Sequence, residues 1–358
     1  MDYRAYGNTG LSVSAIGMGC VQIANSRTEV AVRIVQRALE LGITYFDVAR
    51  AYGDAEVKLG LALEEARERV VVSTKTSART RDEAWTQIHE SLERLRTGYV
   101  DNCHLHALRL GEDMDRRLGP GGALEALVEA RDQGLIRHIG VSSHRSDAAI
   151  AALARFDFDV ILIPMNVVER EPLEVLIPLC REKGVAVTVM KPLATGLLPA
   201  TLSLKWLLNQ PVASIVPGIT TLEELEEDAA VGHEPYALTP EEALRIEEIK
   251  SSLEHVRCRL CAECRPCPQE IPVELILGTD VIYDHYRTMG PDRFRAFPWL
   301  PEKVANELPA RQARIALIES CTRCGACEAR CPHGLPTMDM LQATLPAMRD
   351  MVRIFREP

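Results

Sequence analysis

An alternation of short apolar runs with amphipathic stretches fills the first 220 residues and constrains the fold more than any other feature. Eight runs have the length and character of buried strands, and helical periodicity follows each of them. The expected strands are 15–20, 44–47, 70–75, 100–106, 136–142, 160–164, 185–191 and 214–217, after a hairpin over 3–14. Eight such units within about 250 residues predict an α/β fold, the (β/α)8 TIM barrel, with functional residues at the carboxyl ends of the strands.

The composition changes abruptly after this alternation. Of the eleven cysteines, eight lie beyond residue 257, in a stretch rich in Cys, Pro and Arg. We therefore predict a barrel over residues 1–250 and a small, mostly helical domain over residues 251–358. Cys20, Cys103 and Cys180 lie among apolar residues and are expected to be core thiols.

The overall composition excludes several classes of protein. Hydrophobic residues make up 47% of the 358 residues and charged ones 26%, as in ordinary globular proteins. The net charge of −10 argues against a nucleic-acid-binding surface. No apolar run approaches the roughly 20 residues of a membrane helix, and the N-terminus does not resemble a signal peptide. We expect a cytoplasmic protein that engages neither nucleic acid nor membrane.

Four polar residues lie at or just after the ends of successive expected strands. Asp47 ends one strand and Tyr52 follows in its loop, while Lys75 and His106 end the next two. A buried carboxylate can hold a cation, and a nearby cation lowers the pKa of a phenol from about 10 toward neutrality. Such a phenol can protonate a carbonyl oxygen. Each residue alone would more often be structural, so the prediction depends on the ordered set.

This set resembles the catalytic tetrad of the aldo-keto reductases. The matching segments are FDVARAYGDAEVKLG, VVSTK and YVDNCHLH, together with YRAYGNTGLSVSAIGMG, GLIRHIGVSSH and KPLATGLL. The resemblance implies hydride transfer between a nicotinamide cofactor and a small carbonyl or alcohol. Tyr52 would be the acid, Lys75, held by Asp47, would lower its pKa, and His106 would orient the carbonyl. His104, two residues earlier, is the second candidate for that role.

The resemblance also implies contacts to NAD(P)H. Ser142 would touch the carboxamide, and the other implied contacts are Ser143, Asn166, Lys191, Gly196, Leu197, Gly218, Thr220, Glu227 and Asp228. The chain departs from the family at Ser143, which is usually Asn, at Leu162, often Gln, and at Met190, often Tyr. The segment from Pro217 to Thr221 either holds phosphate or only caps a helix. NADH is slightly favoured, because Glu224 stands where NADP-using members place a basic residue.

Two cysteine runs resemble the ferredoxin-like tail of a subset of the family. The second run, Cys321, Cys324, Cys327 and Cys331, has the bacterial spacing for a [4Fe-4S] cluster whose fourth cysteine serves the neighbouring cluster. The first run, Cys258, Cys261, Cys264 and Cys267, is one residue shorter before its last cysteine. Two clusters with crossed ligands are therefore expected. Alternatively the first run holds one cluster alone, or the cysteines bind zinc. Aromatic residues between the runs, Tyr283, Tyr286, Phe294, Phe297 and Trp299, are interpreted as shielding the clusters.

Two classes of function fit these features. The first is a nicotinamide-dependent carbonyl reductase with associated clusters. The second is an electron-transfer reductase in which a redox protein partner supplies single electrons through the clusters to a substrate in the barrel. The intact tetrad and the lack of a flavin motif favour the first. A third interpretation gives the clusters a purely structural role.

Overall fold

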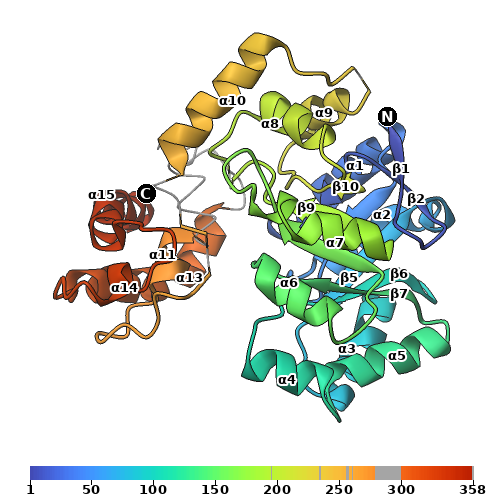
Figure 1. Ribbon diagram of the computed structural model, residues 1–358, viewed down its shortest axis with the longest axis horizontal. Helices are drawn as coiled ribbons and strands as arrows, with labels where there is room; N and C mark the ends of the chain where they lie inside the picture. The colour runs from blue at the N-terminus through green and yellow to red at the C-terminus, as the bar shows by residue number, and fades with distance from the viewer. Residues whose placement is uncertain (195, 234, 255–257, 260, 279–299, 357–358) are drawn as a thin grey trace. The chain divides into compact units, whose positions relative to one another are not determined.

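The computed structural model describes residues 1–194, 196–233, 235–254, 258–259, 261–278 and 300–356 (Figure 1). The chain divides into two compact units. The first comprises Met1–Ala194 and Pro199–Ile246, and the second comprises Thr195–Leu198 and Glu247–Pro358.

The first unit contains a parallel eight-stranded sheet in which the strands follow one another in chain order. The strands are β3 (Met18–Gly19), β4 (Tyr45–Asp47), β5 (Val71–Thr76), β6 (Val100–Leu105), β7 (Ile136–Ser142), β8 (Val160–Pro164), β9 (Ala186–Met190) and β10 (Ser214–Ile215). Parallel bridges from Ile16 to Ile215 and from Gly19 to Gly218 bring the first strand beside the last. The sheet is therefore a nearly closed barrel, as predicted.

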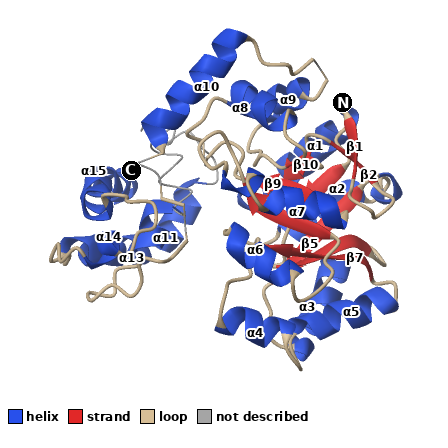
Figure 2. Cartoon of the chain, viewed as in Figure 1, coloured by secondary structure: helices blue, strands red, loops and turns tan. Residues whose placement is uncertain are grey.

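Helices surround the sheet (Figure 2). They are α1 (Thr28–Glu40), α2 (Ala55–Leu63), α3 (Arg81–Arg94), α4 (Glu112–Leu118), α5 (Ala123–Asp132), α6 (Ser146–Leu153), α7 (Leu176–Lys183), α8 (Ala200–Leu208) and α9 (Leu222–Val231). A further helix, α10 (Pro240–Leu253), has residues in each of the two units. Capping boxes start α3 at Thr80 and α9 at Thr221. Helix α4 was not expected from the sequence. Five of its seven residues are charged, so it has no apolar periodicity to detect.

The hairpin that precedes the barrel forms as predicted, from β1 (Tyr3–Ala5) and β2 (Ser12–Ser14). Tyr6, which follows β1, is fully buried, and its hydroxyl donates to the Tyr45 hydroxyl at 3.1 Å. Tyr45 begins β4, so these rings fill the barrel interior near the amino ends of the strands. The carboxyl ends of the strands are left for the polar residues.

The second unit is mostly helical, as predicted. Its helices are α11 (Val273–Gly278), α13 (Leu300–Glu319), α14 (Ala326–Ala329) and α15 (Thr337–Arg356). Helix α15 packs against α11, α13 and α14 around a core that includes Ile276, Ile318, Leu341 and Met348. The aromatic residues interpreted as a shield, 283, 286, 294, 297 and 299, lie outside the described residues. Nowhere in the described chain is a helix long and apolar enough to cross a bilayer.

Candidate active site and cysteine runs

A buried ion pair joins the carboxyl ends of β4 and β5. Lys75 Nζ lies 2.6 Å from Asp47 Oδ1 and donates to the Val48 carbonyl at 2.7 Å. Lys75 is only 1% exposed and Asp47 4%. The second carboxylate oxygen, Asp47 Oδ2, is buried and has no hydrogen-bond partner in the described part of the chain.

The two groups of this pair hold one another in their charged forms. Burial is the largest single influence and opposes the charge on Lys75, but the charge and hydrogen bond of Asp47, together with Tyr52 and Tyr45, outweigh it and raise the pKa of Lys75. Burial raises the pKa of Asp47, and the Lys75 ammonium opposes that rise. At 2.6 Å the attraction favours the ionised pair at neutral pH. Neither member can be removed without leaving a buried charge alone.

The phenol of Tyr52 lies beside this ion pair. The Lys75 ammonium is 5.0 Å from the Tyr52 ring centroid, and the His106 ring meets the Tyr52 ring edge-on at 5.8 Å. Burial raises the pKa of Tyr52 by more than Lys75 lowers it. The predicted net lowering of this pKa is therefore wrong for the chain alone, because desolvation of the phenolate outweighs one neighbouring cation. Tyr52 is thus protonated at neutral pH and is equipped to donate a proton.

His106 follows β6 directly and is also uncharged. Its Nδ1 atom lies 3.2 Å from Ser77 Oγ. Burial, followed by the charges of Lys75 and Arg117, lowers the pKa of His106 to about 3. If the Ser77 hydroxyl donates to Nδ1, then Nε2 carries the ring hydrogen. A neutral histidine of that tautomer can donate to a carbonyl oxygen.

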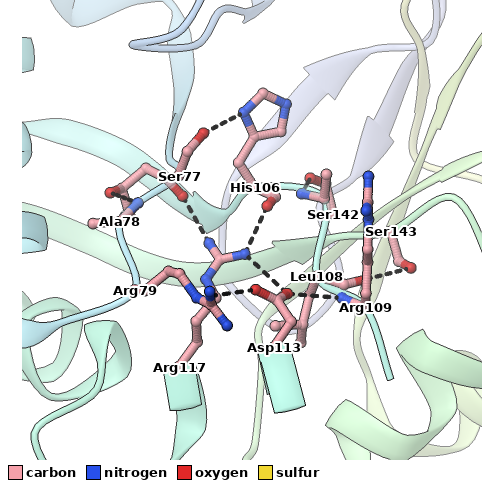
Figure 3. Close-up of polar contacts among 12 residues, drawn as sticks. Ser77, Ala78, Arg79, His106, Leu108, Arg109, Asp113, Arg117, Ser142 and Ser143 are labelled. Carbon is pink, nitrogen blue, oxygen red and sulfur yellow. Dashed lines mark hydrogen bonds and ion pairs between the residues drawn. The ribbon is translucent and has the colours of Figure 1, made fainter. Parts of the chain in front are cut away.

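Arg117, on the unexpected helix α4, holds the two neighbouring strand ends together. It is 2% exposed, and its guanidinium donates to the carbonyls of His106 at 2.8 Å and Thr76 at 2.9 Å. Asp113 lies 3.7 Å from it and accepts the Arg109 amide (Figure 3). The sequence offered no signal for Arg117, since an arginine among other charges looks like a solvated helix face.

His104, the second candidate, lies deep in β6 and not at its end. It is fully buried, and neither ring nitrogen has a partner among the described residues. A Cβ atom on Gly140 would come within 2.4 Å of His104 Nδ1, so the ring occupies space that only glycine leaves. Its position in the barrel interior leaves His106 as the histidine nearest to Tyr52.

Ser142 and Ser143 lie at the end of β7, beside the loop that follows His106. The Ser142 hydroxyl accepts the Ala107 amide at 2.8 Å, and the structure records no acceptor for its hydrogen in the described chain. The Ser143 hydroxyl donates to the Leu108 carbonyl at 2.9 Å. Ser142 therefore keeps a hydrogen to donate, whereas Ser143 is used to fix the loop.

The residues after β8 and β9 that the resemblance assigns to cofactor binding are less available to a cofactor. Asn166 is fully buried, and its side-chain amide donates to Glu169 Oε2 at 2.6 Å and to the Lys191 carbonyl at 3.2 Å. Leu162 packs inside the barrel, with Met190 partly buried against the same cluster. Gly196 and Leu197 fall in the second compact unit.

The start of α9 is a helix cap that Glu224 completes. Its carboxylate accepts the amides of Thr220 at 2.8 Å and Thr221 at 3.2 Å. The exposed Glu227 accepts from the Thr201 hydroxyl. Asp228 is buried, and burial together with Glu227 and Glu224 raises the pKa of Asp228 to about 8. Two of the amides that could bind phosphate, those of Thr220 and Thr221, are thus already paired with a carboxylate.

The scattered cysteines are core thiols, as predicted. Cys20, Cys103 and Cys180 are all buried. Burial raises the pKa of each thiol, to about 12 for Cys103 and Cys180. These thiols are therefore poor nucleophiles.

Cysteines from both runs line one pocket of the second unit. Cys267 of the first run and Cys321, Cys324 and Cys327 of the second surround it, with Met338 among its apolar walls. They do not converge on one point: within the described chain, no three Cys, His, Asp or Glu side chains are close enough to hold a single ion. Ligands spread around a space are what a multi-atom centre requires.

A contact outside this pocket also joins the two runs. Arg330, which precedes Cys331, donates to the Cys264 carbonyl at 3.1 Å and to the Pro266 carbonyl. The end of the second run therefore lies against the first run.

Comparisons with known proteins agree with this geometry. Residues 15–201 match the model of the aldo/keto reductase family, and residues 257–335 match that of the 4Fe-4S dicluster domain. L-galactose dehydrogenase of Arabidopsis thaliana is 29% identical over 72% of this chain and 96% of its own length. The uncharacterized oxidoreductase YqkF of Bacillus subtilis is 30% identical over 55% of this chain and 67% of its own.

Solved structures share the barrel. The holo form of an aldo-keto reductase from Bacillus halodurans is 26% identical, with a TM-score of 0.62 over 70% of this chain and 96% of that one. An aldo/keto reductase from Klebsiella pneumoniae, solved with NADP and acetate, shares the fold at 22% identity and a TM-score of 0.61, with coverage of 70% and 96%. The chain therefore belongs to the aldo/keto reductase family and carries a 4Fe-4S dicluster domain after its barrel.

Proposed function

We propose that the barrel interconverts a small carbonyl compound and its alcohol, with Tyr52, Lys75, Asp47 and His106 as the catalytic residues. The observation that carries the proposal is a protonated phenol between a buried Lys75–Asp47 ion pair and a neutral histidine. Carbonyl reduction requires an acid, a cation that stabilises the anion left when the acid loses its proton, and a hydrogen-bond donor for the substrate oxygen.

The residues would act in the following way. A bound nicotinamide supplies or accepts the hydride at the carbonyl carbon. Tyr52 donates its proton to the substrate oxygen, and the tyrosinate that remains is stabilised by the Lys75 ammonium. Asp47 keeps Lys75 charged and in place. His106 donates from Nε2 to the same oxygen and orients it.

The polar groups near the tetrad suit a nicotinamide amide. Ser142 retains a hydroxyl hydrogen, and the Nδ1 atom of His144 is buried without a partner among the described residues. The Klebsiella pneumoniae enzyme of the same fold was solved with NADP, which supports a nicotinamide cofactor here. Asn166 would have to exchange its bond to Glu169 for one to the cofactor.

We propose that NADH is bound at least as well as NADPH. The carboxylate of Glu224 occupies the amides at the start of α9, and Glu227 and Asp228 lie one turn further on. A 2′-phosphate placed there would meet the negative charges of Glu224 and Glu227. A dissociation constant for NADPH tenfold below that for NADH would overturn this argument.

Substitution of Tyr52 by Phe tests the catalytic assignment. The variant loses the transferable proton alone, so carbonyl reduction should fall by about 10²- to 10⁴-fold. The dissociation constant for NADH, measured by fluorescence titration, should change little. Full turnover by Tyr52→Phe would refute the assignment of the tetrad. A loss of NADH binding would show that the substitution also disturbs the cofactor site.

For the second unit we propose two [4Fe-4S] clusters with crossed ligands. Cys267, Cys321, Cys324 and Cys327 line one pocket and would hold one cluster. Cys258, Cys261 and Cys264 would hold the other with Cys331, whose neighbour Arg330 contacts the Cys264 carbonyl. The adjacent four-thiol sets suit iron–sulfur centres.

Iron counting and a cysteine variant test the crossed arrangement. The anaerobically purified chain should contain about eight irons, since each cluster holds four. Cys331→Ala should damage mainly the cluster of Cys258, Cys261 and Cys264. Spectroscopic damage confined to the other cluster would refute the crossing.

A single-electron reductase is the second candidate function. Leu162 and Met190, which replace polar and aromatic family residues, are the observations that favour it, because they weaken nicotinamide binding. A cytoplasmic redox protein would then be the partner. Cluster absorbance bleached by NADH alone would connect the clusters to the nucleotide and support an electron-transfer role. Turnover that requires a reduced protein partner would favour this second function over the first.

A further inference from the structure

In the described part of the chain, each proposed cluster site has a buried polar side chain beside a ligand sulfur, and the two side chains differ in electrostatic character. Thr337 lies beside Cys327, and Glu274 lies beside Cys264. The hydroxyl and the carboxylate respond in opposite ways to negative charge on sulfur. The two sites are therefore chemically unequal.

Thr337 donates a hydrogen bond to a ligand of the second run. It begins α15 and is 3% exposed, and its Oγ1 lies 3.0 Å from the sulfur of Cys327, which is 7% exposed. Apolar residues such as Leu341 surround this contact. A hydroxyl that donates to sulfur stabilises negative charge there, and the dry surroundings strengthen the effect.

Glu274 presents a carboxylate to a ligand of the first run. It lies on α11 and is 4% exposed, and its Oε2 is 3.8 Å from Cys264 Sγ. Its other oxygen pairs with Arg265. Once Cys264 binds iron as a thiolate it has no hydrogen to donate, so a carboxylate then faces a negative sulfur.

The arginines near the two sites do not remove this difference. Arg265 and Arg330 lie at the first site and Arg323 at the second, so both sites have guanidinium groups. The side chains of Arg265 and Arg323 are 44% and 52% exposed, and Arg323 pairs with Asp339. Solvent screens exposed charges far more than buried ones. The buried hydroxyl and carboxylate therefore determine the sign of the difference.

We propose that the two clusters have unequal reduction potentials, and that the cluster held by Cys267, Cys321, Cys324 and Cys327 is reduced first. The proposal rests on the ligand sets proposed above. Reduction adds one electron to each cluster from an external one-electron donor, with no bond made or broken, and makes the cluster and its thiolates more negative by one charge. Thr337 stabilises that added charge, and Glu274 opposes it at the other cluster.

An anaerobic redox titration of the full-length holoprotein tests the proposal. Dithionite would reduce the protein through mediators while electron paramagnetic resonance follows each cluster. The wild type should give two one-electron waves. Thr337→Val should lower the midpoint potential of the upper wave alone. At a fixed potential, the ratio of reduced to oxidised cluster should fall about fivefold. Thr337→Ser, which keeps the hydroxyl, should restore it.

The second variant is Glu274→Gln, which removes the charge at constant shape. It should raise the midpoint potential of the lower wave alone and increase the ratio of reduced to oxidised cluster by a similar factor. A tenfold change in this ratio corresponds to about 59 mV for one electron. The iron content distinguishes a failure of the proposed ligand sets from a failure of the proposed difference in reduction potential. A content near four irons overturns both the ligand sets and the unequal clusters. A content near eight with one common midpoint overturns the unequal potentials but not the ligand sets. A content near eight with two waves that neither variant moves overturns the assignment of Thr337 and Glu274.

Discussion

Replacement of Asp228 by Asn should reduce the loss of stability of the barrel as the pH rises toward 8. Asp228 is 3% exposed on α9, which packs against α1 and α8. Burial, then Glu227 and Glu224, raises the pKa of Asp228 from 3.8 to about 8. The folded protein therefore keeps a proton on this carboxyl that the unfolded chain gives up. The contribution of Asp228 to the free energy of unfolding is fully present below pH 3.8 and is lost as the pH rises through about 8.

The size of the effect follows from the same two values. Each pH unit between them costs the folded state about 1.36 kcal/mol, so the loss between about pH 5.5 and pH 8 has an upper limit of about 3.4 kcal/mol. Water that reaches the ionised carboxylate lowers this limit, and we expect about 2 kcal/mol. The side-chain amide of the Asp228→Asn variant has no proton to lose. As the pH rises from about 5.5 to 8, the free energy of unfolding of the variant should therefore increase by that amount relative to that of the wild type.

Urea denaturation followed by tryptophan fluorescence measures this difference, since the buried Trp206 lies on the neighbouring helix α8. Glu223→Gln is the matched control, because Glu223 is a solvent-accessible carboxylate on the same helix. The control should follow the wild type at every pH. A constant difference between Asp228→Asn and wild type across this range would refute the reasoning, because it would mean that the carboxyl titrates alike in both states.

Other substitutions probe the tetrad, its support and the cofactor site. Lys75→Met should destabilise the fold by about 3–5 kcal/mol by leaving Asp47 buried and unpaired; adding Asp47→Asn should recover much of the melting temperature but none of the turnover. Arg117→Met should raise the pKa of His106, measured by NMR of the ring protons, because it removes one of the charges that lower it; an unchanged pKa would contradict that cause. Glu224→Gln should lower the dissociation constant for NADPH about threefold relative to that for NADH, and equal changes for both nucleotides would argue against charge recognition. NADH alone should leave the cluster absorbance unchanged while dithionite bleaches it.

The barrel and the meeting of the tetrad were predictable because both follow from regular geometry. Parallel strands with similar connections must bring their carboxyl ends to one edge. Asp47, Lys75 and His106 were recognisable as strand ends from the apolar runs before them, so their proximity needed no further information. In the register of β4 and β5, Asp47 lies opposite Ser73, so Lys75 is two residues further along the neighbouring strand and on the same face, and its long side chain reaches Asp47 at 2.6 Å.

The protonation state of Tyr52 and the role of Arg117 were not predictable in the same way. A pKa depends on the balance between burial and charge, and for Tyr52 burial, which only the folded chain determines, is the largest cause. Arg117 acts through backbone carbonyls, which every residue possesses, so no motif marks its partners. Both properties are decided by packing and not by a local pattern.

The two halves of the chain are suited to different numbers of electrons. A hydride moves two electrons together, and in the proposed reaction the protonated Tyr52 would neutralise the charge that then appears on the substrate oxygen. Each proposed cluster accepts one electron, and unequal sites beside Thr337 and Glu274 would hold a single electron on one of them. A cofactor such as a flavin is needed to divide a hydride into single electrons, and the sequence contains no flavin motif. We therefore infer that the barrel and the clusters take electrons from different donors, with the tetrad serving the nucleotide and the cysteines a one-electron carrier.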